Sequence, residues 1–391
     1  MRIMFIPHLP TLFGRRYQLS KHLVKAGHEV HLILWDMPYP LSFGNLFKNI
    51  KNSLKSETYK KEGIIVHKII RCPLIFPWVN RLLFKKQIRS LFKNENIDII
   101  ISQSFFSEVE PPLDLPFIYD LNDDHQAFAD IYGSRIYKLA YKLLKVKKTI
   151  MNQIKNALAI TTVSERLLKF AKNNTNVSVY KIPNGVEKEF LKKQRINKNN
   201  YSIGYVSHFG EWSKLEELLY SIKDLKKKYP LIKLNLIGDG PEIANAKKII
   251  KKLRLEKNIK LYGKVDNRKR VFEILNNCEI CLNISDKNSF RDASSPIKVF
   301  EYSALGKKII STKLKEVESL NFPNVYFWEG EKIRGLTKKI EEVFHKKIGS
   351  KKIKKIMENY TWENLSKKLS KILKHEIKKI KEKRDFIKYE K

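Results

Sequence analysis

The chain has 391 residues, more than one ordinary hydrophobic core supports, so we expect two domains. Its hydrophobic fraction of 42% includes 21 phenylalanines, which is enough for packed cores and excludes a disordered chain. The 78 basic and 41 acidic side chains give a formal net charge of +37. Such a charge favours phosphorylated ligands, polyanions or acidic membrane surfaces, although a general bias toward lysine would also produce it.

Short apolar runs alternate with helical stretches along the first half of the chain. We expect strands at residues 2–7, 29–35, 64–70, 97–102, 117–121, 157–163 and 177–182. This alternation is typical of a parallel sheet with helices on both faces, where ligands bind beyond the carboxyl ends of the strands. Arg15 and Arg16 begin a helix predicted over residues 15–26, at the end where the helix dipole disfavours positive charge. They could contact an acceptor or a phosphate, and the alternative is that they are plain charges at the start of the helix.

The densest group of acids in the N-terminal half follows the strand predicted at 117–121. The segment runs Asp120-Leu121-Asn122-Asp123-Asp124-His125. These side chains could hold acceptor hydroxyls or stabilise a positively charged transition state. The alternative is a loop with an Asx turn and a helix cap. We expect no metal here, because the segment lacks an Asp-x-Asp pattern.

Two stretches, residues 41–61 and 136–154, combine lysines with apolar residues at helical spacing. Each pattern predicts a basic amphipathic helix, which would either lie on an anionic membrane or pack its apolar face on the core. We expect no signal peptide, because Pro7 and Pro10 interrupt the first apolar run, and no apolar run is long enough to cross a membrane. We expect a cytoplasmic protein that could attach peripherally to the inner face of the cell membrane.

The second half of the chain begins another series of strands and helices. The motif Lys181-Ile182-Pro183-Asn184-Gly185-Val186 stops a strand and turns sharply, and the polar run over 188–200 predicts a linker. Further strands are expected at 203–206, 234–237, 259–263, 279–285 and 308–312. The turn Gly238-Asp239-Gly240-Pro241 follows the second of them. Its glycines suit either the close approach of a ligand or a tight turn.

The stretch Ser294–Thr312 carries the strongest functional pattern. Ser295 suits the cap and Pro296 the first position of a helix that ends in a glycine before a buried strand. Lys298 and Glu301 lie three residues apart on one face of this helix. An open helix N-terminus binds phosphate, a lysine adds charge, and a carboxylate accepts hydrogen bonds from sugar hydroxyls. The combination predicts a site for a nucleoside diphosphate.

This stretch resembles the nucleotide-binding signature of retaining glycosyltransferases with the GT-B fold, known as glycosyltransferase family 4 or group 1. Motifs along nearly the whole chain extend the resemblance. It implies an α/β fold of two Rossmann-like domains whose parallel sheets face each other across a cleft. The implied domains are an acceptor-side domain (1–184), a nucleotide-sugar domain (185–362), and a C-terminal helix with a basic tail (363–391).

The resemblance implies transfer of a hexosyl-type sugar from a nucleoside-diphosphate sugar to a glycan or lipid-linked acceptor, with retention of configuration. Such a reaction serves the biosynthesis of polysaccharides or cell-surface glycans. We expect no metal, no cofactor and no specific nucleic-acid partner. Two alternatives stay open: a sugar-nucleotide epimerase of the same fold, and a non-enzymatic protein that binds polyanions.

The resemblance also distributes the candidate residues over the two predicted domains. The donor would contact His208, Lys214, Gly240, Ser295, Pro296, Lys298 and Glu301. The acceptor side would comprise Gly14, Arg15 and Asp120, with Asp123, Asp124 and His125 in catalytic positions. Glu301 matches a ribose ligand and Lys214 a diphosphate ligand, but His208 stands where the family usually has arginine. A second usual glutamate is replaced by Ala293, and Asp292 beside it could compensate.

Overall fold

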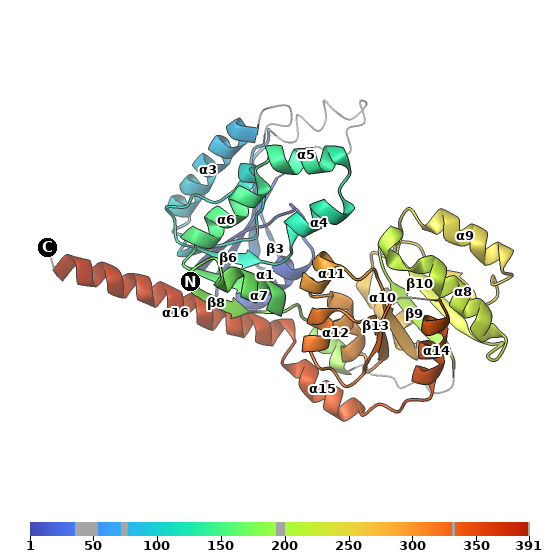
Figure 1. The fold of residues 1–391 in the computed structure, drawn as a ribbon. Coiled ribbons are helices and arrows are strands. Elements are labelled where there is room, and N and C mark those ends of the chain that lie inside the picture. The colour runs from blue at the N-terminus through green and yellow to red at the C-terminus, as the bar shows by residue number, and fades with distance from the viewer. Residues whose placement is uncertain (36–53, 72–76, 193–199, 331–332, 390–391) are drawn as a thin grey trace. The chain divides into compact units, whose positions relative to one another are not determined.

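The structure, a computed structural model, describes residues 1–35, 54–71, 77–192, 200–330 and 333–389. It divides the chain into two compact units (Figure 1). Unit 1 comprises Met1–Pro183 together with Trp362–Lys391, and unit 2 comprises Asn184–Thr361. Each unit is built on its own sheet, so the predicted α/β architecture with two parallel-sheet domains is confirmed.

The sheet of unit 1 has the order β3-β4-β2-β1-β5-β6-β7-β8. Its strands are β1 (Arg2–Ile6), β2 (Glu29–Leu34), β3 (Glu57–Lys61), β4 (Ile64–Lys68), β5 (Ile99–Ser102), β6 (Phe117–Leu121), β7 (Ala159–Thr162) and β8 (Ser178–Lys181). All neighbours pair in parallel except β3 and β4, which form an antiparallel pair. The strand order reverses at β1, so the carboxyl ends of β1 and β5 border the crevice where such sheets bind ligands.

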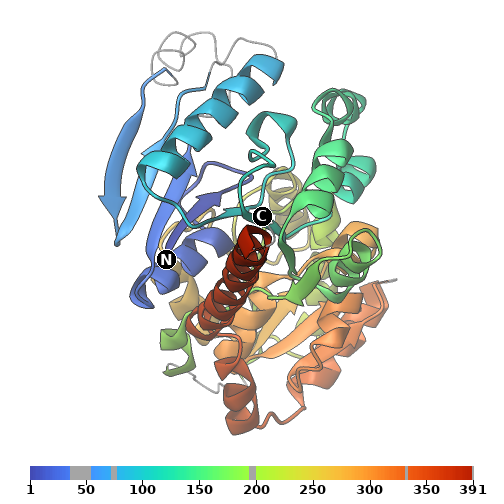
Figure 2. The ribbon, with the colours of Figure 1, turned by 90° about the vertical axis from the view of Figure 1, so that its left-hand side faces the viewer.

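The helices of unit 1 include a C-terminal one that returns from the end of the chain. The unit contains α1 (Arg15–Lys25), α3 (Pro77–Asn94), α4 (His125–Tyr132), α5 (Arg135–Leu143), α6 (Val146–Asn156), α7 (Glu165–Lys172), α16 (Trp362–Tyr389) and the 3-10 helix η2 (Ser107–Val109). Figure 2 views α16 obliquely, with its C-terminal end toward the viewer. Trp362 and Leu365 of α16 share a hydrophobic cluster with β1 and α1, and Ser370 Oγ lies 2.7 Å from His28 Nε2. This helix is therefore part of the core of unit 1.

The sheet of unit 2 is parallel throughout, in the order β11-β10-β9-β12-β13-β14. Its strands are β9 (Ser202–Val206), β10 (Lys233–Ile237), β11 (Ile259–Leu261), β12 (Ile280–Asn283), β13 (Lys308–Thr312) and β14 (Val325–Trp328). Its helices are η3 (Lys188–Lys192), η4 (Glu211–Ser213), α8 (Leu215–Lys226), α9 (Ile243–Lys252), α10 (Arg268–Asn276), α11 (Ser289–Ala293), α12 (Ile297–Ala304), α13 (Lys315–Ser319), α14 (Ile333–Phe344) and α15 (Ser350–Glu358).

Both faces of the unit 2 sheet are buried, which explains why its strands are continuous apolar runs in the sequence. Successive side chains of a strand point to opposite faces. Ile280 and Leu282 accordingly pack with α8 and α14, whereas Cys281 between them packs with α12 and α15. The carboxyl ends of these strands hold several of the residues that the sequence predicts to contact a nucleotide.

Both predicted amphipathic stretches differ from the structure. Within residues 41–61, the part 57–61 is not helical but forms β3, because it pairs with β4 across a turn at Gly63, whose φ is +82°. Residues 41–53 of that stretch lie outside the described residues. The stretch 136–154 is two helices, because Lys145 adopts a left-handed conformation with φ of +51° and separates α5 from α6.

The predicted linker over 188–200 was also partly wrong. Residues 188–192 form η3, and Phe190 is buried with its ring stacked on that of Phe272, with centroids 3.3 Å apart. The buried Phe190 and Leu191 thus anchor the segment to unit 2. Residues 193–199 lie outside the described part of the chain. No helix among the described residues is long and apolar enough to span a membrane.

Candidate active site

The helix that carries the predicted nucleotide signature begins one residue later than predicted. Pro296, not Ser295, occupies the cap position of α12, and no side chain caps the helix there. Ser295 instead binds the Pro-Asn-Gly turn: Asn184 donates from Nδ2 to Ser295 O at 2.6 Å and from its backbone N to Ser295 Oγ at 3.4 Å. The prediction that Ser295 caps this helix is therefore wrong, because its hydroxyl accepts a hydrogen bond from Asn184 N rather than from an N–H group of the helix.

Glu301 lies on α12 and is only 7% exposed. Its carboxylate accepts a hydrogen bond from Arg268 Nη2, and the guanidinium of this arginine, half exposed, also lies 5.8 Å from the ring centroid of Phe272. The two oxygens of a carboxylate have more acceptor positions than this one bond uses, so the group can accept further hydrogen bonds. Glu301 can therefore serve as an acceptor for ligand hydroxyls.

Lys298 lies one turn before Glu301 and reaches the carboxyl end of β9. Its Nζ donates to Val206 O at 3.3 Å and lies 5.0 Å from the ring centroid of Tyr205. Burial is the main cause that lowers the pKa of Lys298 to about 7; the charge of Arg291 lowers it further, and Glu301 opposes the shift. This ammonium group is thus poorly compensated in the structure, and an anion beside it would stabilise its charge.

The loop after β9 holds His208 and Lys214. His208 is exposed, with its ring centroid 6.0 Å from that of Trp212. Lys214 Nζ lies 2.8 Å from Asp286 Oδ1 and 3.3 Å from Glu217 Oε1, and the bond to Asp286 is the main cause that raises its pKa. Two carboxylates therefore fix this lysine as a cation.

Gly240 has a structural explanation that needs no ligand. A Cβ at this position would lie 2.4 Å from Phe209 O, at a φ of +154°. The loop after β9 packs on the loop after β10: Phe209 N donates to Asp239 O at 2.9 Å and Glu242 N donates to Phe209 O at 3.0 Å. The glycine allows this contact between the two loops, so the tight-turn alternative accounts for it.

Asp292 does not replace the missing glutamate. It is 8% exposed, and its Oδ1 accepts a hydrogen bond from Lys315 N at 3.0 Å, where it satisfies the start of α13. The arginine before it does contribute positive charge, because Arg291 lies over the ring of Trp212 with 5.4 Å between its guanidinium carbon and the ring centroid.

In unit 1, Arg15 and Asp120 form a buried ion pair. Arg15 Nε lies 3.0 Å from Asp120 Oδ2 and Nη2 lies 3.1 Å from Oδ1, while Nη1 donates to Pro183 O at 2.8 Å. Asp120 also accepts from Gln103 and Thr161, both at 2.7 Å. Burial alone would raise the pKa of Asp120, but the charge of Arg15 and these hydrogen bonds lower it. Since their polar atoms are used inside the protein, the pair links α1 to β6 and neither residue is placed to contact an acceptor.

Replacing Asp120 with asparagine should lower the free energy of unfolding by about 3–5 kcal/mol, because Arg15 would remain buried without its counter-charge. The exposed pair Arg89–Asp114, 2.7 Å apart, provides the matched control. Asp114→Asn should cost less than about 1 kcal/mol. Chemical denaturation of both variants measures the difference, and equal losses would contradict a structural role for the buried pair.

Asp124 and His125 begin α4 at the carboxyl end of β6. Asp124 is the helix cap, and its Oδ1 accepts a hydrogen bond from Ala127 N at 3.0 Å. The helix cap that the sequence offered as the alternative to a functional role is therefore present. His125 stacks on Phe105 with ring centroids 3.7 Å apart. Burial, and then the nearby His8, lower its pKa well below the usual value, which leaves the imidazole neutral at pH 7.

His125 is the predicted catalytic residue best placed to meet a ligand. Its Nε2 is buried, and within the described parts of the chain it has no hydrogen-bond partner. His8 lies beside it, 5.6 Å between ring centroids, and burial followed by the charge of Arg16 lowers the pKa of His8 to about 4. Asp123 precedes the helix and is half-buried. Gly14 caps α1 with a φ of +78°, a conformation that favours glycine.

Two family models match the chain over consecutive segments. Residues 17–190 match the model described as Glycosyltransferase Family 4, and residues 186–359 match the one described as Glycosyl transferases group 1. The chain belongs to the group 1, family 4 glycosyltransferases. The recognised signature of α12 lies inside the second matched segment.

Curated relatives and solved structures agree with this family. One subunit of the human phosphatidylinositol N-acetylglucosaminyltransferase is 24% identical over 384 residues, which cover 94% of this chain and 74% of the relative. The N-acetyl-alpha-D-glucosaminyl L-malate synthase of Bacillus anthracis is 22% identical, over 76% of this chain and 74% of that protein.

Solved glycosyltransferase structures share the fold of this enzyme. A glycosyltransferase from Rickettsia africae superposes with a TM-score of 0.66 at 17% identity, covering 96% of this chain and 98% of the other. Anabaena HepE in complex with UDP gives a TM-score of 0.64 at 14% identity, over 96% and 100% of the two chains. The predicted GT-B fold is confirmed.

The structure adds two partners of the candidate site residues that the sequence did not indicate. Arg268 pairs with Glu301 from a helix 33 positions away, and nothing distinguishes it from the basic residues Lys269 and Arg270 that follow it. Asp286, which holds Lys214, lies 72 positions beyond that lysine (286 − 214). Such pairings over long sequence distances leave no periodic signal in a single sequence.

Proposed function

We propose that this glycosyltransferase moves a hexosyl-type sugar from a nucleoside-diphosphate sugar to a glycan or lipid-linked acceptor, with retention of configuration. The observation that carries the proposal is the group formed by Lys298, Glu301 and Arg268 in unit 2, where Lys298 reaches the carboxyl end of β9. The resemblance to retaining enzymes supports the stereochemistry. We propose the cytoplasm as the place of action, at the inner face of the cell membrane.

In this proposal the leaving diphosphate is neutralised by Lys298, Lys214 and the N-terminus of α12. Positive groups fixed before the reaction stabilise the charge that develops as the glycosidic bond to phosphate breaks. Glu301 accepts hydrogen bonds from the ribose hydroxyls. In unit 1 the neutral imidazole of His125, whose Nε2 lacks a partner among the described residues, would hydrogen-bond to a sugar hydroxyl.

UDP-N-acetylglucosamine is the donor we propose. The names of both curated relatives contain the N-acetylglucosaminyl group, and the HepE structure contains UDP. A structure of S. aureus TarM, with a TM-score of 0.62 to this chain, contains both UDP and alpha-GlcNAc-glycerol. These ligands belong to the relatives, and they direct the choice of donor to be tested.

The proposal is tested by incubating the protein with UDP-, GDP-, ADP- and dTDP-sugars and measuring the released nucleoside diphosphate. We expect UDP release from UDP-N-acetylglucosamine that increases when a membrane lipid extract is added. The anomeric configuration of the product, read by NMR, tests retention. Formation of an isomeric UDP-sugar without an acceptor would instead identify an epimerase. If the protein neither bound any of these donors nor released a nucleoside diphosphate from them, the proposed activity would be refuted.

A further inference from the structure

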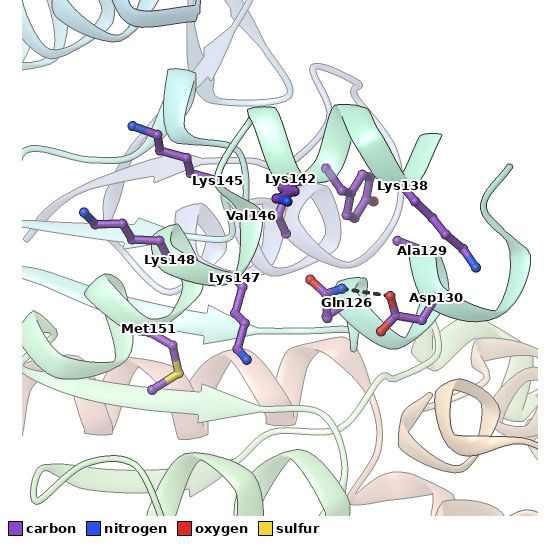
Figure 3. Close-up of a pocket in the computed structure, with 11 residues that line it drawn as sticks. Gln126, Ala129, Asp130, Lys138, Lys142, Lys145, Val146, Lys147, Lys148 and Met151 are labelled. Atoms are coloured by element: carbon purple, nitrogen blue, oxygen red, sulfur yellow. Dashed lines mark hydrogen bonds between the residues drawn. The ribbon is translucent and has the colours of Figure 1, made fainter. Parts of the chain in front are cut away.

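Unit 1 contains a pocket of about 640 Å³ between α4, α5 and α6 (Figure 3). Five of the residues that line it are lysines, and we call it the lysine pocket. They are Lys138, Lys142, Lys145, Lys147 and Lys148. Figure 3 shows Lys145 and Lys148 extending to one side and Lys138 to the other. Both α5 and α6 thus contribute exposed lysines to the lining of the pocket.

The charge of the lysine pocket is not compensated by the protein. Throughout the described residues, none of its five lysines forms an ion pair, whereas Lys308 in unit 2 is paired with Glu279 at 2.9 Å. The lining contains one carboxylate, Asp130, which accepts a hydrogen bond from Gln126 Nε2 at 2.9 Å. Several like charges around one cavity repel each other, and a bound anion relieves this repulsion.

The start of α6 is also suited to an anion. Lys145 occupies the cap position and makes no side-chain cap bond, and the first turn contains Lys147 and Lys148 but no acid. The first N–H groups of a helix lack partners within it, and the helix dipole disfavours lysines at this end. A phosphate in the pocket would accept from such N–H groups and would offset the unfavourable charge.

Apolar side chains lie on the same helix as two of these lysines. Leu139 and Leu143 of α5 are 57% and 66% exposed and are four residues apart, each directly after a lysine of the pocket. Two exposed leucines on one helix face add nothing to the binding of a soluble polyanion. They suit the apolar part of a lipid whose head group is anionic.

The pocket adjoins the acceptor-side residues of unit 1. Gln126, which lines it, directly follows His125 at the start of α4, and α4 begins at the carboxyl end of β6. This edge of the sheet is where ligands bind in such folds. An occupant of the lysine pocket would therefore lie near the predicted acceptor residues rather than on a distant surface.

We propose that the lysine pocket binds the phosphate of an anionic membrane lipid, with Leu139 and Leu143 in contact with its apolar chains. The inference rests on the proposed function and extends it, because it assigns the acceptor side of the enzyme to a phosphate-bearing lipid. The lysines supply charge, the start of α6 supplies N–H donors, and the leucines supply the apolar contact.

The first experiment compares the double variant Lys142→Gln/Lys148→Gln with the control Lys247→Gln/Lys248→Gln, which removes two exposed lysines from α9 of unit 2. Vesicles of phosphatidylcholine with phosphatidylglycerol should bind the pocket variant roughly 25-fold more weakly, at about fivefold per lysine. The control should bind like the unaltered protein, and vesicles of phosphatidylcholine alone should bind neither. Equal losses in both double variants would overturn the proposal, because they would show a general charge effect.

The second experiment separates a lipid from a soluble phosphate, with glycerol 3-phosphate as the soluble probe. Leu139→Ser/Leu143→Ser should weaken vesicle binding but leave the affinity for glycerol 3-phosphate unchanged. If the unaltered protein bound glycerol 3-phosphate in the pocket but no anionic vesicles, the lipid assignment would be overturned. Titration of the unaltered protein with UDP reports separately on the proposed function, so failure of the donor site is distinguishable from failure of the pocket.

Discussion

Replacing Glu301 with glutamine should weaken UDP binding roughly 10- to 100-fold and leave the fold intact. Hydrogen bonds to a charged group contribute about 1.5–3 kcal/mol, and glutamine offers one neutral acceptor oxygen in place of the two charged oxygens of the carboxylate. The variant keeps the size of the side chain, so α12 and its packing in unit 2 should persist. Isothermal titration with UDP measures the affinity, and thermal unfolding checks the fold.

The matched control for this prediction is Glu273→Gln in the neighbouring helix α10. Glu273 pairs with Arg270 at 3.1 Å, as Glu301 pairs with Arg268, but both members of the control pair are exposed. Removing an exposed surface pair should leave UDP affinity unchanged and cost less than about 1 kcal/mol of stability. If both variants bound UDP like the unaltered protein, Glu301 would not be a nucleotide ligand.

The fold could be predicted from the sequence because its strands are buried on both faces. Such strands are short continuous apolar runs, and the run at 117–121 coincides with β6. The predictions of secondary structure were wrong where contacts between segments distant in sequence determine the local conformation. Residues 57–61 end a stretch whose lysines and apolar residues are spaced as in a helix, but their backbone pairs with β4. Phe190 lies in a polar run, but it stacks on a ring from a distant helix.

Site residues could be predicted from the sequence only where they belong to one short motif. Lys298 and Glu301 lie one turn apart on a helix, so their common face follows from the sequence. Burial does not follow from the sequence: Arg15 and Asp120 look like polar residues at strand and helix ends, yet they form an internal ion pair. Arg268 reaches Glu301 only through the fold. The donor residues on α12 were thus accessible to sequence reasoning, and their partners were not.

UDP affinity should fall steeply as the pH rises above 7, because of Lys298. Burial lowers the pKa of Lys298 to about 7, so above that pH the ligand-free protein has a neutral amine at this position. A diphosphate favours the charged form, and binding must therefore take up one proton. By linkage the affinity then decreases by up to about tenfold per pH unit, or as much as roughly 50-fold between pH 7 and 9. A phosphate monoester has its second pKa near 6, so its own ionisation adds little in this range.

Lys214 provides the comparison that identifies the titrating group. Its pKa is raised, chiefly by the hydrogen bond to Asp286, so it stays charged across the same range. Lys214→Met should therefore weaken UDP binding by a similar factor at every pH, without changing the slope. Lys298→Met should weaken binding at pH 7 and abolish the slope and the proton uptake, both measured by titration calorimetry in buffers of different ionisation enthalpy. A slope that persisted in Lys298→Met would assign the proton to another group, and Lys298 would then not be the lysine that neutralises the diphosphate.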